Sequence, residues 1–153
     1  MDFIGAFQAL MTTEKMAKSI NAVLKNAKGH KRAVLRELQE NLNLLLLARK
    51  NQLPPDKVIS KLERKNYLAA ADTGFNFKSI KRSSLKQKTT RDVPQFKKYI
   101  GWSTERLLEN IYLKVKQLQD IVDMQGVSKS LDMSARLENL TRLMILFLEH
   151  IKS

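Results

Sequence analysis

Side chains that commonly carry enzyme chemistry are scarce in this sequence, which has no cysteine and only two histidines, His30 and His150. Without cysteine, disulfides, thiolate zinc sites and cysteine nucleophiles are excluded. No acidic pair accompanies either histidine at the i, i+4 spacing of a helical metal site, and no phosphate-cradling glycine loop or Gly-flanked serine is present. The sequence therefore predicts no catalytic residue, no metal and no cofactor.

Both histidines have structural explanations. His30 follows Gly29 in a predicted turn, and His150 lies near the C-terminal end of the last predicted helix, where the helix dipole favours it. Ribonucleases of the HEPN family, which are small helical bundles, place an arginine a few residues before a histidine. Seven residues separate Arg142 from His150, a longer gap that would set the two side chains about 80° apart around a helix. A small ribonuclease is therefore a minor alternative.

A stretch of cations without an acid is the strongest local signal. Residues 1–98 contain 21 Lys or Arg against 8 Asp or Glu, whereas residues 99–153 contain 7 of each, so the net charge of +13 lies upstream of Tyr99. Because each Lys or Arg that docks on a phosphate releases a counterion, such a stretch predicts a polyanionic partner. Its cations, all between residues 73 and 91, are Lys78, Lys81, Arg82, Lys86, Lys88 and Arg91.

Aromatic residues accompany these cations. Phe75 and Phe77 could stack on unpaired bases, a contact worth about 1–3 kcal/mol per base, and this favours RNA over sequence-specific duplex reading. The alternative is that both rings pin the segment to the protein and that the cations are simply solvated. Further cations around the first predicted turn and at the end of the second predicted helix would extend the surface: Lys28, Lys31, Arg32, Arg49 and Lys50.

The leading hypothesis for function is a non-enzymatic nucleic-acid-binding protein, with RNA favoured. The main alternative is an adaptor or regulatory subunit that docks an acidic protein and forms a homo-oligomer through leucine-rich helices. Residues 44–47 and 143–148 are apolar around a full helical turn, which either an oligomer interface or a central position in a bundle would explain. A membrane-surface binder is a weaker alternative.

Apolar residues recur at three- and four-residue steps, which predicts helices and no strand. Long helices are expected at about residues 2–28 and 31–51, with Gly29 ending the first, and on either side of residues 126–128. Shorter helices are expected at about 56–71, capped by Asp56, and at about 93–100, with an irregular basic segment over 73–91. The resulting fold is an all-α, up-and-down bundle of four main helices with one or two short extra helices.

A chain of 153 residues with 43% hydrophobic residues is long enough to form one domain, in which folding buries about two-thirds of the unfolded surface. We therefore expect a single domain over residues 1–153. The longest apolar runs are far shorter than the roughly 20 residues that span a bilayer, so no transmembrane segment is expected. The N-terminal residues lack the early positive charge of a secretory signal, and the absence of cysteine fits a reducing compartment, so a cytoplasmic location is expected.

Overall fold

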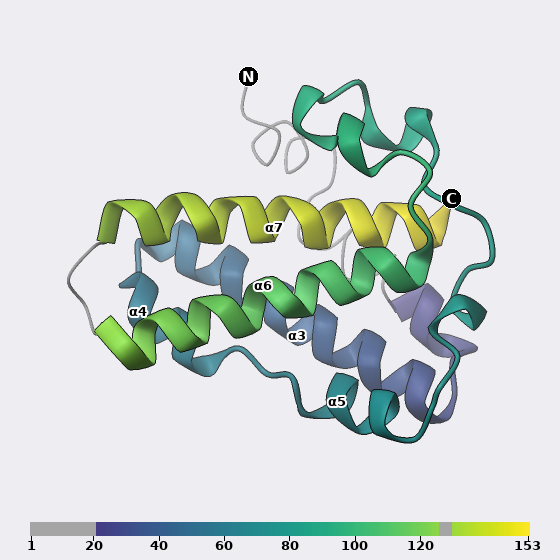
Figure 1. The fold of residues 1–153 in the computed structure, drawn as a ribbon, viewed down its shortest axis with the longest axis horizontal. Coiled ribbons are helices and arrows are strands. Elements are labelled where there is room, and N and C mark those ends of the chain that lie inside the picture. Colours follow the sequence, from purple (N-terminus) through teal and green to yellow (C-terminus); the bar gives the residue numbers. More distant parts are fainter. Residues whose placement is uncertain (1–20, 126–129) are drawn as a thin grey trace.

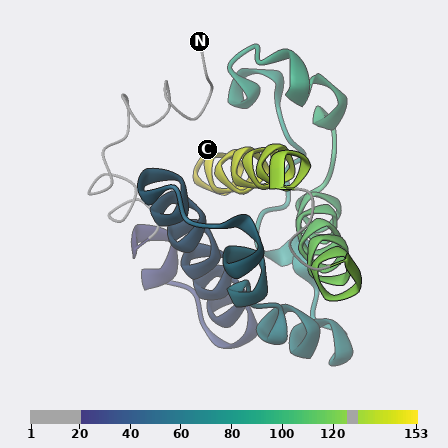
Figure 2. The ribbon, with the colours of Figure 1, turned by 90° about the vertical axis from the view of Figure 1, so that its left-hand side faces the viewer.

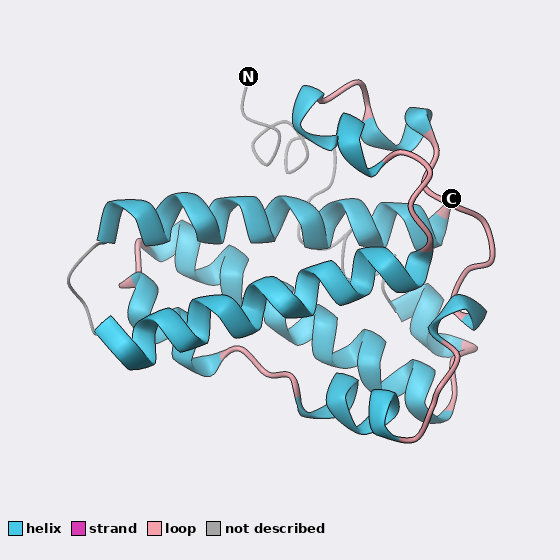
Figure 3. Cartoon of the chain, in the orientation of Figure 1, coloured by secondary structure: helices cyan, strands magenta, loops and turns pink. Residues whose placement is uncertain are grey.

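The computed structural model describes residues 21–125 and 130–153, and this part of the chain consists of helices joined by loops, without a strand (Figures 1 and 3). The all-α prediction is confirmed. The helix expected over residues 2–28 lies mostly outside the described residues. Within the part of it that is described, residues 21–25 are helical. The elements that follow are α3 (Gly29–Asn51), α4 (Pro55–Lys61), α5 (Lys65–Asp72), the 3₁₀ turns η1 (Phe77–Ser79), η2 (Gln87–Thr90) and η3 (Pro94–Tyr99), α6 (Thr104–Gln125) and α7 (Ser130–Lys152).

The long helix α3 begins at the glycine that the sequence marks as a break. Gly29 has a φ of 56°, in the left-handed region that glycine adopts without a Cβ penalty. At the other end, Gln52 is also left-handed, and its N–H donates to the carbonyl of Ala48. The leucines that recur at three- and four-residue steps along this helix are buried: Leu35, Leu38, Leu42 and Leu45.

The prediction of one helix over residues 56–71 is wrong, because α4 ends at Lys61 and α5 begins at Lys65. A buried side chain of α3 makes the break. The amide of Asn41 donates to the carbonyl of Glu63 at 2.9 Å and accepts from the N–H of Glu63 at 2.9 Å. Since this amide bonds both backbone groups of Glu63, it replaces the bonds that a continuous helix would make there.

The two helices also begin differently from the prediction. Asp56 lies in the first turn of α4 and not at its cap, which is Pro54 and has no side-chain hydrogen bond. The start of α5 is bonded by Glu37 of α3, which is 1% exposed. Its carboxylate accepts from the N–H groups of Asn66 at 2.7 Å and Tyr67 at 3.1 Å. A carboxylate from a neighbouring helix thus satisfies first-turn donors and complements the helix dipole.

As predicted, α6 and α7 are antiparallel neighbours, and their contact is the most extensive between described elements (Figure 1). Helix α7 occupies the centre, because α3, α4, α6 and η2 all contact it (Figure 2). Residues 143–148 are each at most 5% exposed. Of the two explanations for this apolar run, the central position is therefore the one found. Leu47, in the other run, is 54% exposed.

Residues 73–91, which we call the basic strap, cross one end of the bundle and lie over the C-terminal end of α7 (Figure 1). Apolar side chains anchor the strap, and Phe77, Ile80 and Leu85 are each at most 8% exposed. The backbone of Leu85 forms two hydrogen bonds of 2.9 Å, one from the N–H of Gly101 and one to the carbonyl of Trp102. The strap is therefore held to the rest of the protein at several points, while most of its other side chains are exposed.

The short helix expected over residues 93–100 is the 3₁₀ helix η3, which has Pro94 in its first turn. It lies on top of α7, as Figures 1 and 2 both show. Phe96 and Tyr99 are buried beneath it. Gly101, with a φ of 87°, then turns the chain into α6. The buried rings therefore hold η3 in a defined position relative to α6 and α7.

Candidate functional site

The start of α3 and the basic strap meet at the same end of the bundle. The Nε2 atom of His30 lies 3.2 Å from the Oγ1 atom of Thr73, and the His30 ring lies 5.9 Å from the ring of Phe75. These contacts place the start of α3 beside the start of the strap, although the two are more than 40 residues apart in the sequence. We call this cation set the basic end; it comprises Lys28, Lys31 and Arg32 of the α3 start and Lys78, Lys81, Arg82, Lys86, Lys88 and Arg91 of the strap.

Lys81 lies at the centre of the strap and is fixed from two sides. Its carbonyl accepts from the hydroxyl of Thr104 at 2.7 Å, and its ammonium donates to the hydroxyl of Ser153 at 3.3 Å. Its pKa is lowered by burial and then by the charges of Lys86 and Lys88. Three strap cations therefore lie close enough to repel one another, which is the condition in which a polyanion relieves repulsion.

Two ion pairs among the described residues involve the first and the last cation of the strap. Lys78 lies 4.0 Å from the carboxylate of Glu105, and Arg91 lies 3.9 Å from that of Glu149. Exposed pairs of this kind contribute at most about 1 kcal/mol and exchange readily with solvent or another anion. Between these two cations, the side chains of Arg82, Lys86 and Lys88 are exposed. The strap thus presents a surface of positive charge to solvent.

The rings predicted to stack on bases are instead part of the core. Phe77 is 6% exposed and half-buried Phe75 meets it edge-on, with ring centres 5.1 Å apart. Tyr67 lies 5.2 Å from Phe77 and stacks on buried Tyr112 at 4.1 Å. The alternative that Phe75 and Phe77 pin the segment to the bundle is therefore the one that fits.

One aromatic residue that the sequence pattern did not single out lies beside the strap. Trp102 is half-buried, and the guanidinium of Arg106 lies 3.8 Å from the centre of its ring. The edge of Tyr99 meets the same ring at 4.9 Å. The spacing of four residues between Trp102 and Arg106 is the signal that could have found this pair. Because Arg106 covers one face, the indole offers limited area for stacking.

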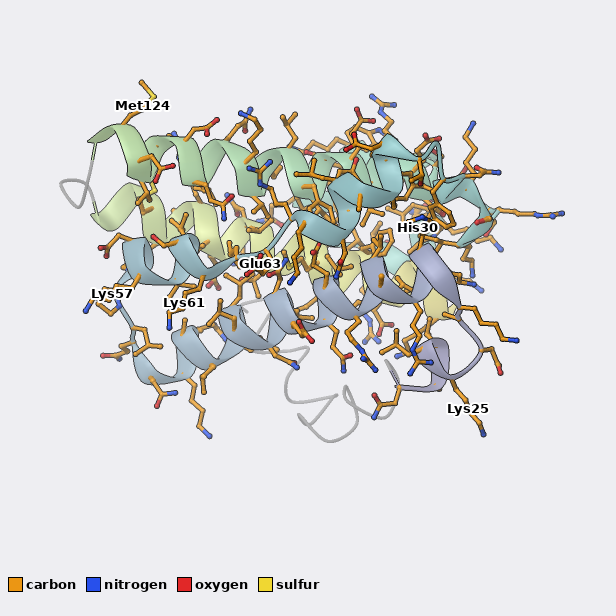
Figure 4. The ribbon with its side chains drawn as sticks, turned by 90° about the horizontal axis from the view of Figure 1, so that it is seen from below. Lys25, His30, Lys57, Lys61, Glu63 and Met124 are labelled. Carbon is orange, nitrogen blue, oxygen red and sulfur yellow. The ribbon has the colours of Figure 1, made fainter. Side chains whose placement is uncertain are left out.

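Arg49 and Lys50 do not join the basic end. They lie in the last turn of α3, which is about 30 Å from its first turn at 1.5 Å per residue. Arg49 bonds the carboxylate of Glu138 at 3.4 Å beside a groove of about 390 Å³ between α3 and α7. In Figure 4, Lys57 and Lys61 mark that opposite end, and His30 and Lys25 mark the basic end. The predicted cation set is therefore divided between two ends of the bundle.

His150 is a structural residue, and the helix-dipole explanation for it is wrong. It is 1% exposed, and its Nε2 atom lies 2.8 Å from the hydroxyl of Thr104. That hydroxyl donates its one proton to the carbonyl of Lys81, so it accepts from an Nε2–H of His150. Burial, and then the charge of Lys81, lowers its pKa to about 4. His150 is neutral at pH 7 and connects the ends of α6 and α7 to the strap.

Within the described residues, no group of three His, Asp or Glu side chains could hold a metal ion. The described helices also include none with the length and hydropathy needed to cross a bilayer. We compared the chain with protein families, with curated proteins and with solved structures, and none of the three comparisons found a match.

Proposed function

We propose that this protein binds the sugar-phosphate backbone of a nucleic acid at its basic end. One observation carries the proposal: cations from two distant segments, residues 28–32 and 78–91, lie at one end of the bundle, and most of their side chains are exposed (Figure 1). Each phosphate contact releases a counterion, so affinity accumulates over several cations without base recognition.

The burial of Phe75 and Phe77 changes the expected mode of binding. The preference for RNA depended on stacking by these rings, and the core already holds them. Phosphate contacts position a nucleic acid and carry no base information, so they do not discriminate strongly between RNA and DNA. The proposal is therefore for sequence-independent backbone binding, with RNA and DNA both included in its test.

The proposed function is non-enzymatic. Its support is the state of the two histidines, because His150 is buried and bonds Thr104, whereas His30 lies at the surface beside Thr73. A general base must reach a substrate proton within hydrogen-bond distance, and His150 is enclosed by the protein. A His150→Ala variant should therefore retain any nucleic-acid binding that survives its loss of stability.

The test is fluorescence anisotropy at low salt with a labelled single-stranded RNA, an RNA hairpin and a duplex DNA. The variant Lys86→Gln/Lys88→Gln removes two of the six charges of the strap, and the matched control Lys57→Gln/Lys61→Gln removes two charges at the opposite end (Figure 4). We expect the strap variant to bind about tenfold or more weakly than the control. The strap variant loses direct phosphate contacts, whereas the control loses only a long-range electrostatic attraction. Absence of binding to all three probes, or equal losses in the two variants, would contradict the proposal.

An acidic protein partner is the second candidate, because the same exposed cations would attract it. The oligomer part of that alternative loses support, since residues 143–148 are buried inside the bundle. A pull-down that yields one stoichiometric protein, unaffected by nuclease, would favour this alternative over the nucleic acid.

A further inference from the structure

A second group of cations surrounds a pocket of about 160 Å³ where η3 covers the groove between α6 and α7. None of the lining residues is acidic, and the group is separate from the basic end. We call it the η3 pocket, and its lining consists of Gln95, Phe96, Lys98, Tyr99, Lys114, Asn139, Arg142 and Leu143.

Three elements contribute one cation each to the η3 pocket. Lys98 comes from η3, whose position is fixed by the buried rings on either side of it, Phe96 and Tyr99. Half-buried Lys114 comes from α6. Half-buried Arg142 comes from α7, and Asn139 lies one turn before it on the same face. The pocket therefore has two kinds of hydrogen-bond donor: the cationic groups of lysine and arginine, and the side-chain amides of Asn139 and Gln95.

The cations of this region crowd one another. The pKa of Lys114 is lowered by burial, then by the charges of Lys98 and Arg136. The carboxylate of Glu138 lies 3.8 Å from Arg142 and also bonds Arg49 at 3.4 Å. The negative charge of Glu138 therefore partly balances Arg142, but Glu138 shares that charge with Arg49. A bound anion would relieve the repulsion at Lys114 and accept hydrogen bonds from several donors at once.

We propose that the η3 pocket binds a phosphate monoester group. Pockets that enclose whole drug-sized molecules measure about 300–1,000 Å³, so a cavity of about 160 Å³ admits an anionic group and leaves the rest of its molecule outside. A monoester has three free oxygens and a charge of about −1.5 to −2 at pH 7, which suits convergent Lys, Arg and amide donors. An internal phosphodiester has chain on both sides and cannot enter in this way. The inference uses different residues from the proposed function and does not depend on it.

The test is isothermal titration calorimetry of the full chain with inorganic phosphate and with adenosine monophosphate. Lys98→Gln and Lys114→Gln each remove one lining cation, and Lys116→Gln is the matched control, since Lys116 is exposed and pairs with Asp120 at 2.6 Å. Each lining variant should weaken binding about ten- to hundredfold, as expected for a lost charged hydrogen bond. The control should stay within about twofold, because an exposed ion pair contributes little.

Absence of saturable binding for both ligands, or an equal loss in the control, would overturn the proposal. Lys98 is exposed on η3, so Lys98→Gln remains a usable test if Lys114→Gln fails to fold. The strap variant Lys86→Gln/Lys88→Gln should leave binding of adenosine monophosphate unchanged, which separates this proposal from the nucleic-acid proposal.

Two sources of a monoester can be distinguished with one pair of oligonucleotides. If a 5′-phosphorylated oligonucleotide binds more tightly than its 5′-hydroxyl form, and Lys98→Gln removes the difference, the pocket takes the terminal phosphate of a polynucleotide. If the two forms bind equally while adenosine monophosphate binds the pocket, the ligand is a small phosphate ester.

Discussion

The basic end and the η3 pocket present positive charge in opposite ways. At the basic end, most cations lie close together in the sequence. The strap that carries them is anchored by buried apolar residues, and most of the cationic side chains are exposed to solvent. At the η3 pocket, Lys98, Lys114 and Arg142 come from three elements and line one cavity. An outward array attracts a long polyanion over a distance, whereas an inward cluster makes several bonds to one small group.

The difference shows that charge density along a sequence and convergence of charge in space are separate properties. Residues 99–153 are neutral overall, with 7 cations and 7 acids. They nevertheless supply two of the three cations of the η3 pocket, Lys114 and Arg142. No acid of the same segment is among the lining residues: Glu138 lies 3.8 Å from Arg142 but outside the lining, and Asp120 pairs with Lys116. A neutral segment can thus contribute to a positive site when folding sorts its charges onto different faces.

The largest expected effect separates the anchors of the strap from its charges. Phe77→Ala should lower the free energy of unfolding by about 3–5 kcal/mol, because it removes a buried ring and leaves a cavity. Lys86→Gln/Lys88→Gln should change it by about 0.5 kcal/mol or less, since both side chains are exposed. Urea unfolding measures both values. Equal effects of the two variants would mean that the strap is not anchored through Phe77.

The next effect concerns acid and the connection between the strap and the helices. The pKa of His150 is lowered from 6.5 to about 4 in the folded protein, so the unfolded chain takes up its proton first as the pH falls. The contribution of His150 to the free energy of unfolding is fully present above pH 6.5. It is lost as the pH falls toward about 4, and the loss is about 3 kcal/mol at most.

The variant His150→Gln isolates this effect, because glutamine can still donate to Thr104 but does not titrate. Urea unfolding at pH 7 and at pH 4.5 should show a smaller loss of stability in the variant than in the wild-type protein. Identical losses would mean that carboxylates alone cause the acid sensitivity. Because His150 bonds the residue that holds the carbonyl of Lys81, acid should loosen the basic end.

A smaller effect distinguishes the two regions through salt. The logarithm of affinity for a nucleic acid should fall linearly with the logarithm of salt concentration, and each lost phosphate contact should reduce that slope by about 0.7 on a single strand or 0.9 on duplex DNA. Lys86→Gln/Lys88→Gln should therefore flatten the slope, and Lys114→Gln should leave it unchanged for an oligonucleotide without a terminal phosphate. Anisotropy titrations over a salt series measure both. A flattened slope for Lys114→Gln alone would move the interface from the strap to the η3 pocket.

Most of the helical fold could be predicted from local patterns. Apolar steps in α3, α6 and α7 identify the long helices, and Gly29 and Pro94 mark boundaries through backbone geometry that depends on the residue itself. The break between α4 and α5 was missed because its cause is not local. Asn41 and Glu37 lie more than 20 residues before the backbone groups that they bond, and no pattern within residues 56–71 reports them.

The candidate sites show the same limit. Phe75 and Phe77 read equally well as stacking rings or as anchors, and only the positions of Tyr67 and Tyr112 decide between these readings. For His150, position in the helix suggested the dipole, whereas the Thr104 hydroxyl that bonds it comes from another helix. The η3 pocket could not be predicted from a local sequence pattern, since its lining cations are spread from residue 98 to residue 142.

The smallest expected effect tests whether the two cation groups are physically distinct. Lys98→Gln removes a charge that disfavours the protonated form of Lys114, so the pKa of Lys114 should rise, although burial still holds it below its usual value. By the same reasoning, Lys86→Gln should raise the pKa of Lys81. Each variant should leave the other lysine unchanged, which NMR titration of the two side chains measures. A rise at Lys114 in Lys86→Gln would mean that one continuous field covers both regions, and the distinction between an outward array and an inward cluster would fail.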